Sequence, residues 1–530
     1  MNLNLTISKS QIYKIRSILH AIPLHKVVFG LSLLLSIVAT IVYLKQDLIL
    51  AYGDAESHLN IAKRITQSIT PGFAQLGGIW LPIPHLFMVP FVFFDPLWRT
   101  GLAGSLVSGI SFVISSLFVY KLAFLLTRNS LASFFAALVF MLNPNILYLQ
   151  STPMTEMLLI MFFLLSSYYY ISYIKNERRL SSLLLASFFG FCAVLTRYDG
   201  WFLVLFEALI LIGVHLSKHE RWQKIEGKFI LFSTLAFFGA VLWMLWDFLI
   251  LGNPFYFITS EFSAHTQQLN WLQRGELPAY HNLPLAVLYY MVTVMSNSGV
   301  FIFLISIFGF IFFIKNNKNL YRYAISGVLL VPIFFNTFTL FAGQSVIFIP
   351  HLTPISFEWR LFNVRYGSLA LPAIAFFCAY ALYRCKSLGP KFLIFILFIL
   401  QFGLYFVGYS QIITISDGVY GLSHAKRPDA ENFIVKHYDS GKVLIDDYAR
   451  TLSIIRSGIP MQNIIYVGNK PYWENALREP EHYVTWIIMQ KDDAVWKNLY
   501  GTPEAQGRLY NSYQKVYTSP QILIFKKTTR

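Results

Sequence analysis

The chain has 530 residues, of which 56% are hydrophobic and only 13% are charged. Soluble globular proteins carry about 25% charged residues, so this composition excludes an ordinary soluble enzyme or binding module. The formal net charge of +16 does not indicate a nucleic-acid partner, because the cations lie mainly in short loops between apolar runs, where membrane proteins collect them.

The N-terminal segment, residues 1–26, is basic and precedes the first apolar run. It lacks the short basic region and the small-residue cleavage site that mark a secretory signal peptide. We therefore interpret residues 1–26 as a cytoplasmic segment that leads into the first transmembrane helix.

Apolar runs then follow along most of the chain. They approach the roughly 20 residues that a helix needs to cross a bilayer, and a spanning segment must satisfy its backbone without water. The sequence predicts an all-α polytopic membrane protein with about eleven transmembrane helices. The runs lie at about residues 27–44, 102–120, 131–149, 157–174, 180–196, 201–216, 229–251, 285–314, 323–342, 367–383 and 392–410.

The loops between these runs alternate in character. Every second loop is short and basic, which places it in the cytoplasm by the positive-inside rule. This pattern puts the N-terminus inside, and an odd number of helices leaves the C-terminus outside, as expected for a multi-pass protein of the cell membrane. The basic residues of the predicted inner loops are Lys121 and Arg128; Lys175, Arg178 and Arg179; Lys218, Arg221, Lys224 and Lys228; Lys315, Lys318 and Arg322; and Arg384, Lys386 and Lys391.

Three predicted outer loops are long, at residues 45–101, 252–284 and 343–366, and they are rich in Pro, Gly, Trp and His. Long loops in a compact architecture usually carry function. We therefore predict a transmembrane domain over residues 27–410 whose working face is the outer one.

The composition changes from residue 411 onward to that of a small soluble domain. Apolar and β-branched stretches predict strands there, separated by short helices. We expect an extracytoplasmic α/β domain over residues 411–530 with no catalytic motif; an acceptor-binding role and a structural capping role both remain open. The predicted strands are Lys442–Tyr448, Asn463–Val467, Tyr483–Met489 and Gln521–Phe525, and the predicted helices are Ala430–His437 and Tyr472–Leu477.

The most informative segment follows the first apolar run and contains Asp54, Glu56 and His58. Charged side chains at the membrane are rare and costly, so acids there suggest a functional site. If a helix begins near Glu56, Asp54 could simply cap it. The functional interpretation makes Asp54 a general base, with Glu56 beside it and His58 near a phosphate-bearing lipid.

A second acid, Glu156, opens the fourth run at the same face. It could serve only as a partner of the helix dipole. Alternatively, Asp54, Glu56 and Glu156 could jointly hold a divalent cation or orient an acceptor hydroxyl. Whether a metal is used stays unknown at this point.

Two arginines return to the outer face. Arg197, Tyr198 and Asp199 lie between the fifth and sixth runs, and we predict that they bind the donor phosphate or the substrate. Asp199 could also be no more than the local ion-pair partner of Arg197. Arg365 and Tyr366 open the tenth run. A guanidinium fork, a phenol and the positive end of a helix dipole together form a phosphate-binding group.

Other candidates carry weaker signals. His85, in the Trp-Leu-Pro-Ile-Pro-His stretch, could touch a phosphate or a sugar. Glu207 and Asp247 lie within apolar runs and could be buried structural residues. Cys192, Cys378 and Cys385 show no metal-ligand or disulfide spacing, so we interpret them as packing residues.

The order of these motifs resembles the GT-C superfamily of integral-membrane glycosyltransferases, and within it the protein O-mannosyltransferase and aminoarabinose-transferase-like branch. The resemblance covers residues 27–410. It rests on the Asp54-x-Glu56 pair after the first helix, the acid Glu156 at the fourth, Thr196–Trp201 after the fifth, and Asn363–Tyr366 at the tenth. No Trp-Trp-Asp-Tyr-Gly motif occurs, which speaks against an oligosaccharyltransferase that makes N-linked glycans.

The resemblance implies a polyprenyl-phosphate sugar as donor and an acid of the first outer loop as base. Asp54 matches that acid and Glu56 its partner, while Glu156 matches the acid of the second outer loop. Arg197 and Arg365 stand where donor-phosphate contacts are expected. The implied reaction is an inverting transfer to an acceptor hydroxyl of a glycan, lipid or protein.

Two other functions remain open. A polysaccharide polymerase or ligase with diphosphate-linked lipid donors would share the outer face and the lipid carrier. A secondary transporter would normally show internal repeats and midplane charges; no clear repeat is present, and Glu207 alone keeps this option open.

Overall fold

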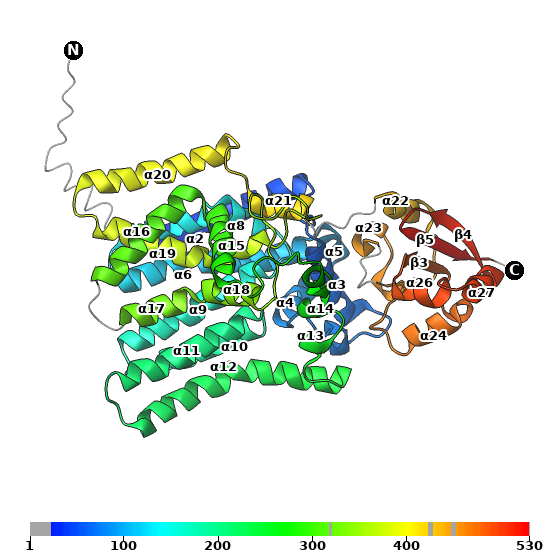
Figure 1. The fold of residues 1–530 in the computed structure, drawn as a ribbon, viewed down its shortest axis with the longest axis horizontal. Helices are drawn as coiled ribbons and strands as arrows, with labels where there is room; N and C mark the ends of the chain where they lie inside the picture. Colours follow the sequence, from blue (N-terminus) through cyan, green and yellow to red (C-terminus); the bar gives the residue numbers. More distant parts are fainter. Residues whose placement is uncertain (1–22, 317–320, 422–427, 447–451, 529–530) are drawn as a thin grey trace, which may run out of the picture.

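A computed structural model describes residues 23–316, 321–421, 428–446 and 452–528. Most of the predicted N-terminal segment, Lys318 in a predicted inner loop, and residues 447–448 of the first predicted strand lie outside these ranges. A helical bundle lies at one end and a C-terminal α/β region at the other, with α3, α4, α5, α13 and α14 between them (Figure 1).

Within the described residues, seven helices are long and apolar enough to cross a membrane. Two bent helix pairs pass the same criterion together, with bends of 114° and 56°, and raise the number to nine if each pair is one span. The seven are α2 (Leu24–Lys45), α6 (Leu102–Thr127), α9 (Glu156–Lys175), α11 (Asp199–Leu216), α12 (Trp222–Leu251), η2 with α19 (Val364–Arg384), and α20 (Leu388–Phe406). The pairs are α15 (Leu283–Ser298) with α16 (Val300–Asn316), and α17 (Tyr321–Leu329) with α18 (Val331–Phe341).

All eleven predicted runs form helices, but two are short: α7 (Ser130–Met141) has 12 residues and α10 (Leu180–Val194) has 15. The run at 131–149 is divided because Asn143 caps a second helix, α8 (Pro144–Leu149), through its side chain. The multi-pass helical fold is thus confirmed, while the count of eleven and the orientation of the termini stay predictions.

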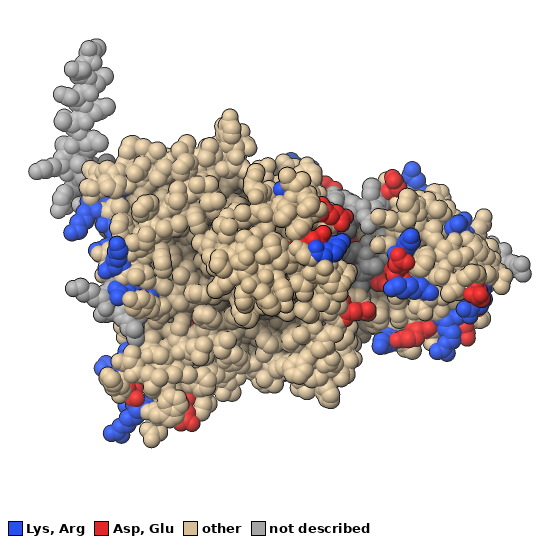
Figure 2. Space-filling view, viewed as in Figure 1, with Lys and Arg blue, Asp and Glu red and all other residues tan. Residues whose placement is uncertain are grey.

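The bundle has a buried centre and an apolar rim. In α9 and in the η2–α19 segment, 83% of the residues of the apolar stretch are buried, whereas in α2 and α20 only 17% are buried. Figure 2 shows a wide uncharged surface over the bundle, with Lys and Arg gathered at the end far from the C-terminal region. Such a surface suits contact with lipid chains.

The outer segments are helical in part. They contain α3 (Gly53–Gln67), η1 (Phe73–Leu76), α4 (Ile83–Val92), α5 (Asp95–Thr100), α13 (Tyr256–Thr259) and α14 (Ala264–Gln273). α3 follows α2 closely and packs on α4. Because α3 begins at Gly53, Asp54 lies in its first turn, where a carboxylate is favoured by the helix dipole.

The C-terminal region forms a mixed five-stranded sheet of order β2-β1-β3-β5-β4. β1 pairs in parallel with β2 and β3, while β5 is antiparallel to β3 and β4. The predicted small sheet is confirmed, although β4 was not predicted. The strands are β1 (Val443–Ile445), β2 (Ile464–Ile465), β3 (Trp486–Gln490), β4 (Tyr513–Thr518) and β5 (Ile522–Lys527); the helices are α21 (Ile413–Tyr420), α22 (Pro428–His437), α23 (Ile454–Ser457), η3 (Met461–Asn463), α24 (Tyr472–Arg478), α25 (Pro480–Tyr483), α26 (Ala494–Leu499) and α27 (Pro503–Ser512).

Candidate active site

Arg365 lies on η2, a 3₁₀ helix, rather than at the start of an α-helix. The α-helix α19 begins only at Leu371, with Pro372 in its first turn, where the missing N–H costs nothing. Gly367 lets η2 pack closely on α15, because a Cβ there would come within 2.5 Å of the Thr293 carbonyl oxygen. This close contact brings the backbone of η2, which carries Arg365, against α15.

The Arg365 guanidinium joins acids from three distant segments. Its Nη2 donates to Asp54 Oδ2 at 2.8 Å, and its Nε donates to Glu156 Oε1 at 3.0 Å. Its Nη1 lies 3.7 Å from Asp417 Oδ2. The side chains of Glu156 and Asp417 are 0% exposed and that of Arg365 is 4% exposed, so these charges are almost fully desolvated.

Arg197 joins the same cluster from the start of α11. Its Nη1 donates to Glu156 Oε1 at 3.2 Å, and its Nε donates to Asp199 Oδ2 at 3.1 Å. The Tyr366 ring lies close to both guanidinium groups, at 5.0 Å from that of Arg197 and 5.1 Å from that of Arg365. Tyr366 therefore makes cation–π contacts with both arginines.

Burial alone would lower the pKa of Arg197, but the carboxylates of Asp199 and Glu156 raise that pKa above its ordinary value. Arg197 is thus charged in this site, and Arg365 is charged as well because arginine is not deprotonated in proteins. Asp54 and Arg197 are the more accessible members, with side chains 15% and 17% exposed. A ligand would reach the cluster beside these two groups.

Sequence analysis missed Asp417, which lies on α21 between the bundle and the C-terminal sheet. Burial raises the pKa of Asp417 to about 6, although Arg365 favours the charged form. Tyr52, also missed, lies beside Asp417: its hydroxyl is 3.3 Å from Asp417 Oδ2 and donates to the Thr414 carbonyl oxygen at 2.7 Å. The sequence did contain an indication that Asp417 is important, because it is the only acid between Glu358 and Asp429.

His58 and His85 form a buried pair, with His58 Nδ1 2.9 Å from His85 Nε2. Burial lowers the pKa of His58 to about 4, and the nearby charge of Asp54 offsets this only in part. His58 is therefore neutral near pH 7. Its ring also packs against Trp80, at 4.5 Å between centroids.

Two predicted site residues point elsewhere. Glu56 accepts hydrogen bonds from Ser453 Oγ at 2.7 Å and from the Ile455 backbone N–H at 3.2 Å, and so holds the start of α23. Tyr198 donates from its hydroxyl to the Ile79 carbonyl oxygen at 2.7 Å. The structure thus brings together Asp54, Glu156, Arg197, Asp199, Arg365 and Tyr366, with His58 and His85 as a separate pair near them.

The three acids considered for a metal do not converge on one point. Both oxygens of Glu56 bind the start of α23, while Glu156 Oε1 and Asp54 Oδ2 bind arginines. Hard divalent cations need several oxygens directed at one centre. The geometry of Asp54, Glu56 and Glu156 does not fit a metal site formed by these three acids.

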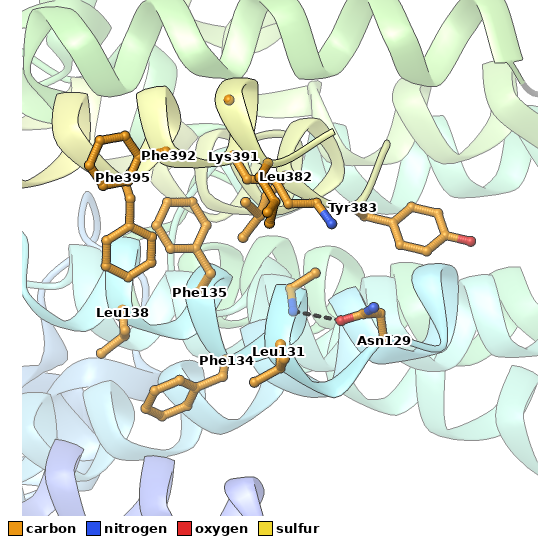
Figure 3. Close-up of a pocket in the computed structure, with 13 residues that line it drawn as sticks. Asn129, Leu131, Phe134, Phe135, Leu138, Leu382, Tyr383, Lys391, Phe392 and Phe395 are labelled. Carbon is orange, nitrogen blue, oxygen red and sulfur yellow. Dashed lines mark hydrogen bonds between the residues drawn. The ribbon is translucent and has the colours of Figure 1, made fainter. Parts of the chain in front are cut away.

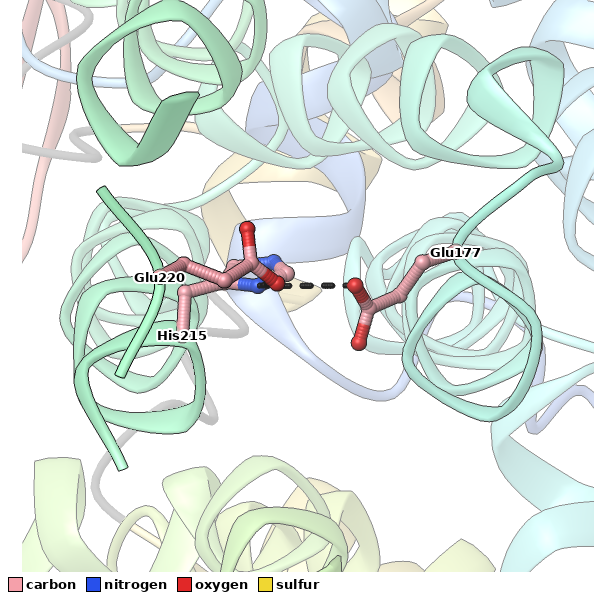
Figure 4. Close-up of side chains that lie close together, drawn as sticks. All are labelled: Glu177, His215 and Glu220. Carbon is pink, nitrogen blue, oxygen red and sulfur yellow. Dashed lines mark hydrogen bonds and ion pairs between the residues drawn. The ribbon is translucent and has the colours of Figure 1, made fainter. Parts of the chain in front are cut away.

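A different group of possible ligands, Glu177, His215 and Glu220, has ligand atoms within 4.8 Å of one another (Figure 4). Glu156 and Asp199 begin α9 and α11, whereas Glu177 follows the end of α9 at Lys175 and His215 lies in the last turn of α11, which ends at Leu216. This group therefore lies at the other end of the bundle. The Lys228 ammonium already lies among the three side chains, 2.9 Å from Glu220 Oε2 and 3.3 Å from His215 Nδ1. Lys218 also binds Glu177.

Within the described residues, no hydrogen bond or ion pair joins Glu207, Asp247 or the cysteines to the cluster around Arg197 and Arg365. Glu207 is buried and accepts a hydrogen bond from Ser166 Oγ at 2.9 Å. Asp247 is buried on α12. All three cysteines are free.

Solved structures of similar fold cover nearly the whole chain, although no protein-family model matches it and no curated protein matches it in sequence. ArnT from Cupriavidus metallidurans bound to undecaprenyl phosphate aligns over 94% of this chain and 98% of its own, with a TM-score of 0.58 and 12% identity. The apo state of ArnT aligns over 92% of this chain and 97% of its own, with a TM-score of 0.52 and 11% identity. The Archaeoglobus fulgidus oligosaccharyltransferase in complex with Zn and sulfate aligns over 94% of this chain and 73% of its own, with a TM-score of 0.50 and 12% identity.

At these identities the likeness concerns the fold. It extends through the bundle and the C-terminal region, beyond the residues on which the sequence motifs rest. This chain has the fold of the GT-C integral-membrane glycosyltransferases.

Proposed function

We propose that this protein is a membrane glycosyltransferase that moves a sugar from a polyprenyl-phosphate donor to an acceptor hydroxyl, with inversion at the anomeric carbon. The observation that carries the proposal is the Asp54–Arg365 ion pair at 2.8 Å, set in a buried cluster with a second arginine, Arg197. A candidate base and two candidate phosphate ligands thus share one site.

Among the described residues, the cluster holds more carboxylates than guanidinium groups, so we expect a phosphate to displace a carboxylate when it binds. Its ion pairs join Asp54, Glu156, Asp199 and Asp417 to two described arginines, Arg197 and Arg365. The partly exposed Asp54 is the carboxylate that an incoming phosphate can displace from Arg365 at least cost. Displacement would remove the Arg365 guanidinium from the Asp54 carboxylate and so make Asp54 a better base.

The reaction then proceeds in one displacement. The acceptor oxygen bonds to the anomeric carbon as the bond from that carbon to the lipid phosphate oxygen breaks. Asp54 takes the acceptor proton, and the lipid phosphate leaves with the bonding electron pair. Arg365 and Arg197 stabilise its developing charge, which is often a large part of catalysis.

The positive-inside rule supports an extracytoplasmic position for this site, because Lys and Arg gather at the opposite end of the bundle (Figure 2). The same placement speaks against a secondary transporter, whose binding site lies near the midplane. A polymerase or ligase with diphosphate-linked donors would use the same site, so the donor assay below includes both donor types.

The test is sugar transfer by the purified full chain in liposomes, with a panel of polyprenyl-phosphate and polyprenyl-diphosphate sugars. Asp54→Asn removes the base and should lower turnover about 10²- to 10⁴-fold. The matched control is Asp47→Asn on the same loop, whose side chain is 81% exposed and 3.6 Å from Arg456. Equal turnover by Asp54→Asn and wild type would exclude Asp54 as the base, and turnover of diphosphate donors alone would favour the ligase.

A further inference from the structure

An apolar groove of about 820 Å³ lies between α7, the end of α19 and the start of α20. Leucine and phenylalanine side chains supply most of its lining. Figure 3 shows Lys391, Tyr383 and Asn129 toward one end of the groove and Phe395, Phe135 and Leu138 toward the other. The groove is thus amphipathic along its length.

α20 covers the groove loosely. Phe392 is 68% exposed and Phe395 is 46% exposed, although both face this groove. Aromatic side chains of this size are usually covered in a folded chain. In a membrane, acyl chains are the natural cover for such a surface.

The polar end of the groove is positive and lacks nearby acids in the sequence. The stretch from residue 102 to 155, which contains α7, has Lys121 and Arg128 and no Asp or Glu. The stretch from 366 to 416, which contains α19 and α20, has Arg384, Lys386 and Lys391 and again no Asp or Glu. Within the described parts of the chain, no carboxylate forms an ion pair with Lys391, so its charge is available to a ligand.

We propose that this groove binds an anionic glycerophospholipid of the membrane leaflet at the basic end of the bundle. Its acyl chain packs against the α7 and α20 phenylalanines, and its phosphate lies at the Lys391 ammonium, with the Tyr383 hydroxyl as a second donor. Basic pockets between transmembrane helices recognise anionic headgroups in this way. A zwitterionic lipid would gain the same apolar contact but less from the unopposed cations.

The test measures the unfolding temperature of the full chain in dodecyl maltoside micelles as lipid is added. Phosphatidylglycerol should raise this temperature in a saturable manner, and phosphatidylcholine with the same acyl chains should raise it less. Lys391→Gln should weaken the apparent affinity for phosphatidylglycerol about fivefold, the equivalent of about 1 kcal/mol for one cation near a lipid surface. Lys224→Gln, an exposed lysine on α12 that does not line the groove, is the matched control and should behave as wild type.

A second variant, Leu138→Trp, fills the apolar end and should reduce binding of both lipids. Equal responses to the two lipids, or an unchanged affinity in Lys391→Gln, would overturn the proposal. Cross-linking that finds residues 1–22 or a second copy of the chain in the groove would also overturn it.

Discussion

Two charged clusters lie at opposite ends of α9 and α11, and they differ in how their charges are held. At the start of these helices, the arginine cluster formed by Asp54, Glu156, Arg197 and Arg365 is almost buried, with Glu156 0% exposed. At the far end, the lysine cluster formed by Glu177, His215, Glu220 and Lys228 is more open, with Lys228 19% and Glu177 24% exposed. Since α9 has 20 residues, about 30 Å separates the clusters, which is close to the thickness of a bilayer core.

The difference shows why only one cluster is a candidate for chemistry. Planar guanidinium forks bind two acids at once and can exchange one of them for a phosphate. In the lysine cluster the ammonium groups of Lys218 and Lys228 balance the carboxylates of Glu177 and Glu220, and water screens the pairs. Four predictions follow from this contrast and from the burial of the charged groups.

The largest effect should follow removal of an arginine. Arg365→Met leaves Glu156 and Asp417 buried with less positive charge and should lower the free energy of unfolding by about 3–5 kcal/mol, with loss of sugar transfer. The matched change, Lys228→Met, breaks partly exposed pairs and should cost less than about 1 kcal/mol. Denaturation of both variants in detergent measures the difference, and equal losses would contradict the contrast between the clusters.

Asp417→Asn should reduce kcat about tenfold, because Arg365 loses one of its three carboxylate partners and its position becomes less fixed. That decrease corresponds to about 1.4 kcal/mol in the activation free energy. Asp439→Asn, in the C-terminal region, removes an exposed pair with Lys526 and serves as the control. An unchanged kcat in Asp417→Asn would mean that Asp417 does not position Arg365.

The pH dependence of stability tests the burial of His58. Its folded-state pKa of about 4 lies below the ordinary value of 6.5. Between these values the unfolded state binds the proton and the folded state does not, so stability falls as pH decreases through this window, by at most about 1.4 kcal/mol per pH unit.

His58→Gln should therefore show a shallower decrease in unfolding temperature between pH 6.5 and 4.5. Asp417, with its pKa raised to about 6, acts in the opposite direction but is present in both proteins. Parallel profiles for the two proteins would contradict a neutral buried His58.

The smallest effect should be that of metal on the lysine cluster. Zinc or a chelator should leave the unfolding temperature of the wild type unchanged, because Lys228 lies among the possible ligands. In Lys228→Met the ammonium no longer lies among His215, Glu220 and Glu177, although Lys218 still binds Glu177, and zinc should raise the unfolding temperature of that variant. Stabilisation of the wild type by zinc would show that the lysine does not block the site.

Much of the arginine cluster was predictable, since its members Asp54, Glu156, Arg197 and Arg365 stand next to apolar runs at one predicted face. Their mutual contacts were not, because Arg365 and Asp54 are 311 positions apart in the chain. Glu56 shows the limit most clearly. Two residues after Asp54 on α3, it projects in another direction and holds α23.

The amino-acid sequence by itself determined that this chain crosses a membrane as helices, since hydrophobic runs must satisfy their backbone locally wherever they are placed. The order of acids and arginines along the chain likewise indicated the GT-C fold. Tertiary structure alone decided that Asp417 joins the cluster, that Glu56 leaves it, and that Arg365 lies on a 3₁₀ turn. These features depend on how each helix is rotated about its axis and packed on distant neighbours, and local residue patterns do not specify that.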